Sequence, residues 1–258
     1  LIDIPKDVQF ANGTYTEKEK VIIPSHRLFE PEIFKNDEKI NEVLNLISKA
    51  KKPIFYIGGG CINSGPKASE LVAQLVEMTG APATMTLMGL GVLGSSHPNS
   101  LGMLGMHGMY EANMAMHDCD VMINIGARFD DRVTGRLDAF SPNSKKIHID
   151  IDESNINKTI KVDVPVVGDV TSVLKRVVKT WKDNNLQTNE SDLKLWWDKI
   201  NKWKKIDCLH FNNNEKEIKP QYAIQRLYEL TKDKNTFITT EVGQHQMWAA
   251  QYYKFEKP

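Results

Sequence analysis

Short apolar runs alternate with amphipathic stretches along most of the chain, and this alternation constrains the fold more than any other feature. Strands are predicted at 53–57, 82–87, 121–126, 145–152 and 162–169. Helices are predicted between and around them, at 37–50, 66–79, 109–119 and 170–183. Strands that alternate with helices favour a parallel sheet covered on both faces. We therefore expect an α/β, Rossmann-like central domain over 36–183, with a parallel sheet of five or six strands.

The residues before this domain have a different character. Residues 1–8 alternate between apolar and polar side chains, which predicts a short strand that stops at Pro5. The polar residues 9–35 have the composition of a linker. The chain begins at Leu1 with a strand already in progress. We therefore interpret the chain as an internal piece of a longer polypeptide.

The residues after the domain predict a second unit. A linker and one helix (191–206) would occupy 184–216, with an apolar helix face that lies on a neighbouring domain: Leu193, Trp196, Ile200 and Trp203. Beyond it the βα pattern starts again. A helix at 220–231, a strand at 235–243 and a helix that starts at Gln244 would form the truncated beginning of a second α/β domain over 217–258.

Charge and cysteine usage exclude several classes of function. Lys and Arg together number 33, as do Asp and Glu, so the chain has no general attraction to nucleic acid or to an anionic membrane. No apolar run approaches the roughly 18 residues that a transmembrane helix needs. The 3 cysteines are far apart in the sequence. This spacing excludes a disulfide framework or a zinc ribbon and fits a reducing cytosol.

The residues that follow each predicted strand are the candidates for ligand binding, because ligands of parallel sheets lie beyond the carboxyl ends of the strands. Gly58–Gly60 follow the first strand and let a backbone approach a ligand, although a plain strand-to-helix turn explains them equally well. The residues 88–108, rich in glycine and methionine, follow the second strand. A loop of this length is usually functional and its methionines suit flat rings, but a buried packing segment is the alternative.

Charged residues follow the later strands. Arg128 follows the third strand, and its planar fork suits a phosphate, but its charged neighbours could form a self-neutralising surface cluster instead. Asp150 follows the fourth strand, where an acid would meet ribose hydroxyls; Asp169 follows the fifth and could simply cap the next helix. Walker A, GxSxG and HExxH motifs are absent from the sequence. These residues predict a domain for a nucleotide-type cofactor without a visible catalytic group.

A set of sequence strings, taken together and in order, resembles the catalytic subunits of the acetohydroxyacid synthase (acetolactate synthase) family, which depend on thiamine diphosphate. The two most specific strings are GMLGMHG and RFDDRVTG. The others are LIDIPKDVQ, YIGGGC, EMTGAPATMTLMGLG, KKIHIDIDESNINK, VVGDV, KPQYAIQ and EVGQHQMWAAQYY. The resemblance covers nearly the whole chain.

The resemblance implies three domains and a known chemistry. Residues 1–8 would close a pyrimidine-binding domain, 36–183 would be an FAD-binding domain, and 217–258 would open a pyrophosphate-binding domain. The family condenses two pyruvates, or pyruvate and 2-oxobutyrate, with loss of CO2, at the start of branched-chain amino-acid synthesis. Its cofactors are FAD, thiamine diphosphate and Mg2+. The activating glutamate and the metal-binding segment of the family are not among the residues present, so we expect this chain alone to be inactive.

The resemblance also assigns residues to sites. The FAD contacts would be Gly59, Thr86, Leu87, Leu104, Gly105, Met106, His107, Gly126, Ala127, Arg128, Phe129, Asp130, Asp150, Ile151, Asp169 and Val170. The thiamine diphosphate contacts would be Val242, Gln244, His245 and Met247. The substrate and herbicide channel would be lined by Lys6, Met106, Asp131 and Arg132. No metal ligand is expected in this chain.

The resemblance further implies 2-oxoacid substrates, a homodimer or tetramer of catalytic subunits, a possible small regulatory subunit and a bacterial cytoplasmic location, with neither nucleic acid nor membrane as a partner. The nearest alternative is another FAD-containing thiamine-diphosphate enzyme, of the glyoxylate carboligase or pyruvate oxidase type. A non-catalytic nucleotide-binding module is the alternative from a different class.

Overall fold

The computed structural model describes residues 4–14, 36–214 and 216–258. The chain divides into two compact units, Leu1–Glu30 and Pro31–Pro258. In the first unit, the described residues form one short helix, α1 (Lys6–Phe10), and channel candidate Lys6 is its first residue. The strand predicted to stop at Pro5 is not confirmed: residues 1–3 lie outside the described residues, as does 15–35 of the predicted linker, and neither Ile4 nor Pro5 is in a strand. Pro5 begins the helix, and its carbonyl accepts a hydrogen bond from Gln9 N at 3.0 Å.

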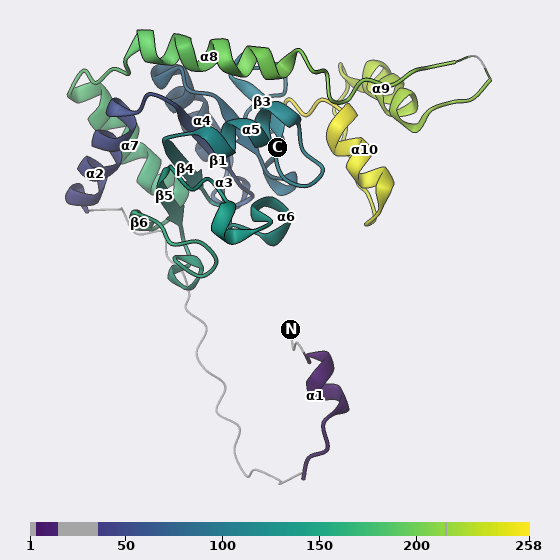
Figure 1. Cartoon of the computed structure of the whole chain (residues 1–258), viewed down its shortest axis with the longest axis horizontal. Helices are drawn as coiled ribbons and strands as arrows, with labels where there is room; N and C mark the ends of the chain where they lie inside the picture. The colour runs from purple at the N-terminus through teal and green to yellow at the C-terminus, as the bar shows by residue number, and fades with distance from the viewer. Residues whose placement is uncertain (1–3, 15–35, 215) are drawn as a thin grey trace. The chain divides into compact units, whose positions relative to one another are not determined.

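The second unit is built on one parallel sheet of six strands in the order β3-β2-β1-β4-β5-β6 (Figure 1). The strands are β1 (Pro53–Ile57), β2 (Ala83–Met85), β3 (Ser100–Met103), β4 (Val121–Ile125), β5 (Lys145–Asp150) and β6 (Val164–Val167). This arrangement confirms the predicted α/β class and the parallel sheet of five or six strands.

The helices of the second unit follow the predicted pattern closely. They are α2 (Asp37–Lys49), α3 (Gly60–Asn63), α4 (Pro66–Thr79), α5 (Tyr110–Asp118), α6 (Asp131–Thr134), α7 (Val170–Asp183), α8 (Glu190–Lys204), α9 (Pro220–Thr231) and α10 (Gln244–Tyr252). Three 3₁₀ turns lie at Leu87–Gly89, Leu137–Ala139 and Glu153–Asn155. Among the described residues, no helix combines the length and the apolarity that crossing a membrane requires.

Each face of the sheet packs against its own set of helices. Alternate residues of β1 show this division, because Phe55 and Ile57 belong to one buried cluster and Ile54 and Tyr56 to the other. The first cluster includes the apolar faces of α2, α4 and α7. The second includes those of α5 and α8. The predicted apolar face of α8 therefore covers the central sheet, and Trp196 Nε1 donates to the Pro53 carbonyl at 3.0 Å.

Side chains at the helix ends account for where several helices start and stop. Asn36 Oδ1 accepts from Lys39 N at 3.0 Å at the start of α2. Pro66 occupies the first turn of α4, and Gly80 ends that helix with a φ of 65°. Asp169 Oδ2 accepts from Ser172 N at 2.9 Å and caps α7. The Asp169 contact confirms the capping role that the sequence suggested for this residue.

Two strand predictions are wrong. Strand β3 lies inside the segment 88–108 that was expected to be a loop, where Ser100 and Met103 pair with Ala83 and Met85 of β2. Conversely, 235–243 forms no strand. A strand needs the backbone groups of a neighbouring strand, and β2 supplies them to the glycine-containing SLGM, whereas no strand among the described residues pairs with 235–243.

Candidate functional site

The six parallel strands bring their carboxyl ends to one edge of the sheet, and most of the predicted cofactor residues lie in the loops that follow them. We call this the carboxyl edge, and define it by the loops 58–60, 86–88, 104–108, 126–132, 150–152 and 168–170. Ligands of parallel sheets bind at this edge. The loops after β1, β2 and β4 come from well-separated parts of the sequence, and their mutual contacts define the centre of the edge.

The glycine turn after β1 packs directly on the backbone after β4. Gly58 N donates to the Ile125 carbonyl at 2.9 Å, and Gly60 N donates to the Gly126 carbonyl at 3.0 Å. A Cβ atom on Gly58 would lie 2.2 Å from Gly126 O, a distance that no side chain tolerates. Glycine is thus required for this close approach of two backbones, which accounts for part of the GGG sequence without any ligand.

Gly59 occupies a different position in the same turn. A Cβ atom there would meet the Cβ and carbonyl oxygen of Met88 at 3.1 and 3.2 Å. Met88 itself exposes 72% of its surface. Sequence reasoning did not single out Met88, although its place directly after Thr86 and Leu87 was a usable signal.

The loop after β4 contains a backbone conformation that is rare for a residue with a side chain. Phe129 has a φ of 53° and is buried. Its ring packs edge-on against Tyr56 and His148, with centroid distances of 5.6 and 5.1 Å. Such strain persists where the surrounding structure holds the residue in place, and it is concentrated at binding sites. The loop is therefore held in one conformation by packing beneath it.

The side chains on either side of Phe129 face solvent. The Arg128 side chain is 72% exposed, and its Nη2 donates to Asp130 Oδ2 at 3.0 Å. The Asp130 pKa is lowered, chiefly because its carboxylate accepts a hydrogen bond from Arg132 N. Part of the charged cluster is thus self-neutralised, as the surface alternative predicted. A guanidinium with one partner still has donors free for an anion.

Beneath this loop lies a buried hydroxyl without a hydrogen-bond partner among the described residues, that of Tyr56. Burial raises the pKa of the Tyr56 hydroxyl, the charge of Asp130 raises it further, and Arg128 opposes both effects. The hydroxyl therefore remains protonated at neutral pH. An orphaned buried donor of this kind is common where a ligand or water completes a site.

The loop after β3 joins the loop after β4. Asn113 of α5 binds both backbone groups of Gly105, with distances of 2.8 Å to the N and 2.9 Å to the carbonyl oxygen. Met106 N donates to the Arg132 carbonyl at 2.8 Å, while the Met106 surface is 63% exposed. The structure therefore brings together the predicted flavin residues Leu104–His107 and the predicted channel residues Asp131 and Arg132.

Two carboxylates lie at the predicted nucleotide end of the site, those of Asp150 and Asp169. Asp150 is buried, and its Oδ1 accepts from Asp152 N at 2.8 Å. Asp169 accepts from Ser64 Oγ at 2.6 Å in addition to capping α7. Ser64, at the end of α3, was not predicted. Ile151 is exposed, and Val170 is buried in the first turn of α7.

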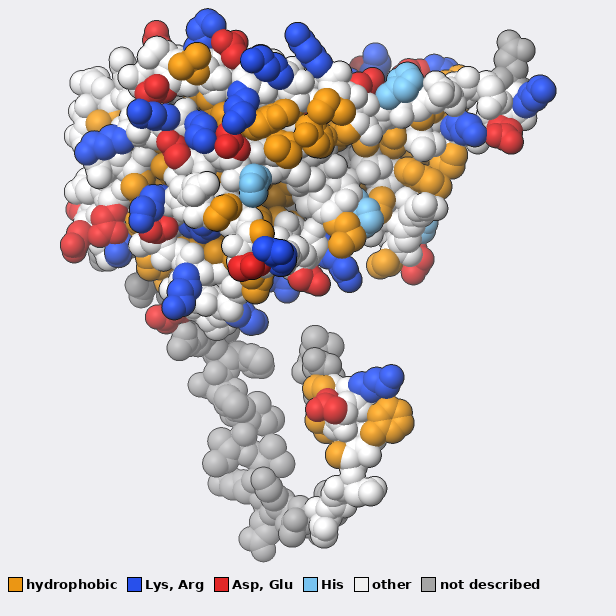
Figure 2. All heavy atoms as spheres, viewed as in Figure 1, with side chains coloured by type: hydrophobic (Ala, Val, Ile, Leu, Met, Phe, Trp, Pro, Cys, Tyr) orange, Lys and Arg blue, Asp and Glu red, His pale blue; other side chains and the backbone are white. Residues whose placement is uncertain are grey.

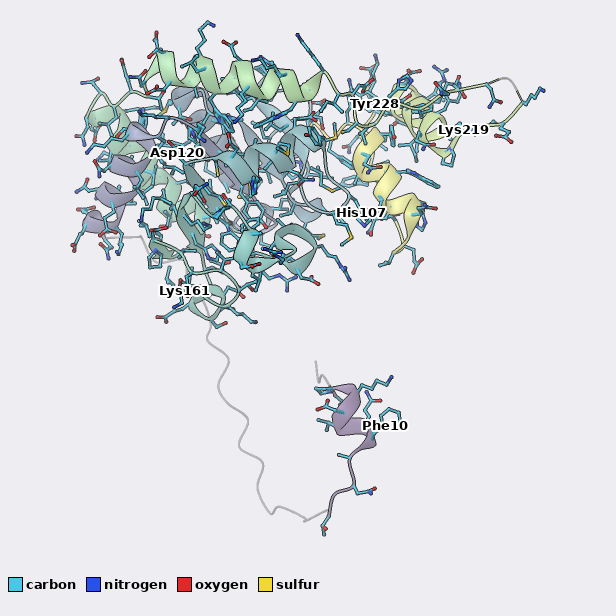
Figure 3. All side chains as sticks on the ribbon, viewed as in Figure 1. Phe10, His107, Asp120, Lys161, Lys219 and Tyr228 are labelled. Carbon is cyan, nitrogen blue, oxygen red and sulfur yellow. The ribbon has the colours of Figure 1, made fainter. Side chains whose placement is uncertain are left out.

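The predicted thiamine residues lie elsewhere, around the start of α10. Gln244 is the first residue of that helix, Val242 and His245 are exposed, and Met247 is half-buried. In the described part of the chain, none of their side chains is hydrogen-bonded to the sheet. Farther along α10, Gln251 Nε2 donates to the His107 carbonyl at 2.8 Å, so the helix meets the carboxyl edge through His107. His107 is labelled in Figure 3.

The donor set of the carboxyl edge fits a flat-ringed dinucleotide. The edge carries the exposed apolar side chains of Met88, Met106 and Ile151, and the exposed guanidinium groups of Arg128 and Arg132. Glycines bring the backbones together at the centre. Within the described residues, no group of three or more His, Cys, Asp or Glu side chains could hold a metal ion. The residues present therefore fit a flat-ringed dinucleotide.

The chain matches the protein family described as "Thiamine pyrophosphate enzyme, central domain" over residues 40–177. This range lies within the predicted central domain, 36–183. It runs from α2 to α7 and includes every strand of the sheet.

The chain is also similar, over its whole length, to acetolactate synthases from bacteria and plants. It is 44% identical to the acetolactate synthase large subunit of Buchnera aphidicola subsp. Schizaphis graminum (strain Sg) and covers 44% of that protein. It is 40% identical to the acetolactate synthase isozyme 3 large subunit of Escherichia coli (strain K12) and again covers 44%. It is 41% identical to the chloroplastic acetolactate synthase of Arabidopsis thaliana and covers 38%. The chain thus spans less than half the length of these relatives.

Proposed function

The chain belongs to the thiamine pyrophosphate enzyme family, and from this premise we propose that it is the flavin-binding central part of an acetolactate synthase large subunit. The observation that carries the proposal is the identity of 40–44% with proteins of that name across the whole chain. The names of these relatives favour this assignment over a glyoxylate carboligase or pyruvate oxidase. The reaction would join two pyruvates, or pyruvate and 2-oxobutyrate, with loss of CO2.

The carboxyl edge supports FAD as the bound cofactor. Arg128 would bind the diphosphate through the donors that Asp130 leaves free. The joined glycine turns would let the dinucleotide run close to the backbone, and Met88 and Met106 would give the isoalloxazine ring an apolar, polarizable surface. Asp150 and Asp169 would face the nucleotide end, since a carboxylate can accept more bonds than the backbone and serine donors already supply.

The remaining parts of the activity would require residues and cofactors beyond the carboxyl edge. Thiamine diphosphate, when bound, would supply the chemistry that removes CO2 from the first 2-oxoacid. In this chain, Gln244 and His245 at the start of α10 would hold its diphosphate, because the N-terminus of a helix favours negative charge. Met106, Asp131 and Arg132 would line the route of the substrate. Magnesium would be held by residues outside this chain.

The assembly proposed for the complete enzyme is a homodimer or tetramer of catalytic subunits, with a small regulatory subunit as a further partner and the bacterial cytoplasm as its location. These proposals rest on the same family membership and on the names of the relatives.

The test of the flavin site is a comparison of two arginines in the complete enzyme. Arg128 and Arg136 are both exposed, and each is paired with an aspartate two residues later, at 3.0 and 2.7 Å. Loss of a charge-assisted contact costs about 1.5–3 kcal/mol, so Arg128→Ala should weaken FAD binding about ten- to a hundredfold. Arg136→Ala should leave the affinity unchanged. Equal dissociation constants for the two variants in a flavin-fluorescence titration would refute the assignment of Arg128.

A further inference from the structure

A row of polar side chains crosses the buried face of the sheet beneath α5 and α8. Thr84, Tyr56, Asn124 and His148 lie on four neighbouring strands and are paired in register, Thr84 with Tyr56, Tyr56 with Asn124, and Asn124 with His148. All four are fully buried. Paired residues of adjacent strands point to the same face, so this is one continuous polar row within an otherwise apolar cluster. Burying such groups is costly unless each makes a specific contact.

Asn124 makes two contacts, both to the backbone of the residue that precedes Arg128. Its Nδ2 donates to the Ala127 carbonyl at 2.8 Å, and its Oδ1 accepts from Ala127 N at 3.0 Å. One buried amide thus satisfies both polar backbone groups of Ala127, which lies beyond the end of β4. This two-point contact fixes both the position and the orientation of the peptide groups that lead into Arg128.

His148 reaches the same carbonyl from the next strand. Its Nε2 lies 2.9 Å from Ala127 O, so Nε2 is the protonated ring nitrogen. The same nitrogen is 3.5 Å from Asp150 Oδ2 at the nucleotide end. The His148 ring also packs against Phe129, whose left-handed backbone turns the chain between Arg128 and Asp130.

These contacts surround Arg128 without touching its guanidinium. We propose that Asn124 and His148 are positioning residues, which hold the Ala127–Phe129 backbone so that the exposed Arg128 side chain meets an anionic dinucleotide in one fixed arrangement. The inference rests on the proposed flavin site. A loop that is already in its bound conformation does not lose entropy again when the ligand binds, and this saving appears as affinity.

The test measures FAD affinity by flavin fluorescence in the complete enzyme, with thermal unfolding of the flavin-free protein in parallel. Asn124→Ala should weaken FAD binding roughly tenfold. The matched control is Asn99→Ala, because Asn99 Nδ2 also donates to a backbone carbonyl, that of Ala81 at 3.0 Å, but before the strands rather than after them. Asn99→Ala should change stability and leave the FAD affinity at the parent value.

A double-variant cycle separates positioning from a general structural role. If Asn124 acts through Arg128, Asn124→Ala should weaken FAD binding much less in an Arg128→Ala background than in the parent. Equal effects of Asn124→Ala in the two backgrounds, or an equal loss of affinity with Asn99→Ala, would overturn the inference. FAD affinity unchanged by Arg128→Ala alone would instead refute the proposed flavin site, and the inference with it.

If Asn124→Ala does not fold, a second pair of variants tests the same positioning role through His148. His148→Gln retains an N–H donor near the position of Nε2, whereas His148→Leu removes it at similar volume. We expect His148→Gln to bind FAD more tightly than His148→Leu, with the difference lost in the Arg128→Ala background. The same affinity for both His148 variants would overturn the role of the Ala127 contact.

Discussion

Phe55, in the central strand of the sheet, is fully buried, whereas Phe237, in the segment that follows α9, exposes 83% of its surface. The contrast extends to the regions around them. Helices on both faces of the sheet bury their apolar sides, but α9 has no buried residue, and Ile218, Leu230 and Val242 are exposed. Figure 2 shows apolar side chains open to solvent in this part of the chain.

Both regions have a sequence pattern that predicts strands alternating with helices, but only in the first do neighbouring strands pair into a sheet. In the C-terminal segment, α9 and α10 pack on each other, and the ring of Tyr228 in α9 lies 5.3 Å from that of Tyr253, the residue directly after α10. Helices satisfy their own backbone groups, so α9 and α10 form without a sheet. The strand expected at 235–243 has no pairing strand among the described residues. The comparison shows that a helix forms its backbone hydrogen bonds within itself, whereas a strand needs a neighbouring strand to form them.

The difference in burial between the two regions is tested most directly by removing a phenylalanine ring from each. Phe55→Ala should lower the free energy of unfolding by about 3–5 kcal/mol, because it leaves a cavity in the core. Phe237→Ala should change it by less than about 0.5 kcal/mol, because the ring is already in water. Urea unfolding followed by circular dichroism measures both values. A large loss with Phe237→Ala would mean that the segment is covered in solution.

A functional comparison of the two regions uses His245 at the start of α10. In the complete enzyme, His245→Ala should raise the thiamine diphosphate concentration for half-maximal activity roughly tenfold, because one hydrogen bond to a charged group is lost. The FAD content should remain that of the parent, since the carboxyl edge is unchanged. His210→Ala, another exposed histidine, serves as the control. A parallel loss of FAD would show that the two regions are not independent.

The smallest expected effect is on stability, and it compares an ion pair that joins two separate elements with one between neighbouring residues. Asp118 contacts Lys199 of α8 at 2.7 Å and Lys52 before β1 at 3.3 Å. Partial burial favours its neutral form, but the two lysines outweigh this effect and lower the Asp118 pKa. Asp118→Asn should therefore cost up to about 1 kcal/mol at pH 7.

The pH dependence checks the origin of this loss. A lowered folded-state pKa stabilises the protein above the unfolded pKa of about 4, and this stabilisation disappears as the pH falls through the folded value. Parent and Asp118→Asn should therefore converge in stability in acid. Glu217→Gln is the control from the C-terminal segment, where Glu217 pairs with nearby Lys219. A difference between parent and Asp118→Asn that persists at low pH would assign the loss to packing.

The sequence predicted the elements whose signals are local. The bounds of α4, α7 and α9 were predicted to the residue, because apolar spacing of 3.6 residues is reinforced by Pro66, Gly80, Asp169 and Pro220. Strand β3 was missed because SLGM contains glycine and no β-branched residue. Its strand character comes from pairing with β2, and no local pattern encodes that.

The candidate site was predictable to a similar extent. The rule that ligands lie beyond strand ends located Gly59, Met106 and Arg128 in loops that the structure places on one edge. It did not locate Asn124 or His148, which lie inside the strands. Their signal was present, because a polar residue interrupts each of the apolar runs VMINI and IHI, but the contacts to Ala127 require the fold.

The strand order has a consequence for synthesis on the ribosome. Strand β1 is central, and its partners on one side, β2 and β3, are complete once residue 103 has been made. Its partner on the other side, β4, ends at residue 125. Protein synthesis adds about 5–20 residues per second, so the edge of β1 that faces β4 stays unpaired for roughly 1–4 s after β1, β2 and β3 are complete. During this interval the nascent chain exposes a ready site for aggregation or for a chaperone, and the arrival of β4 closes it.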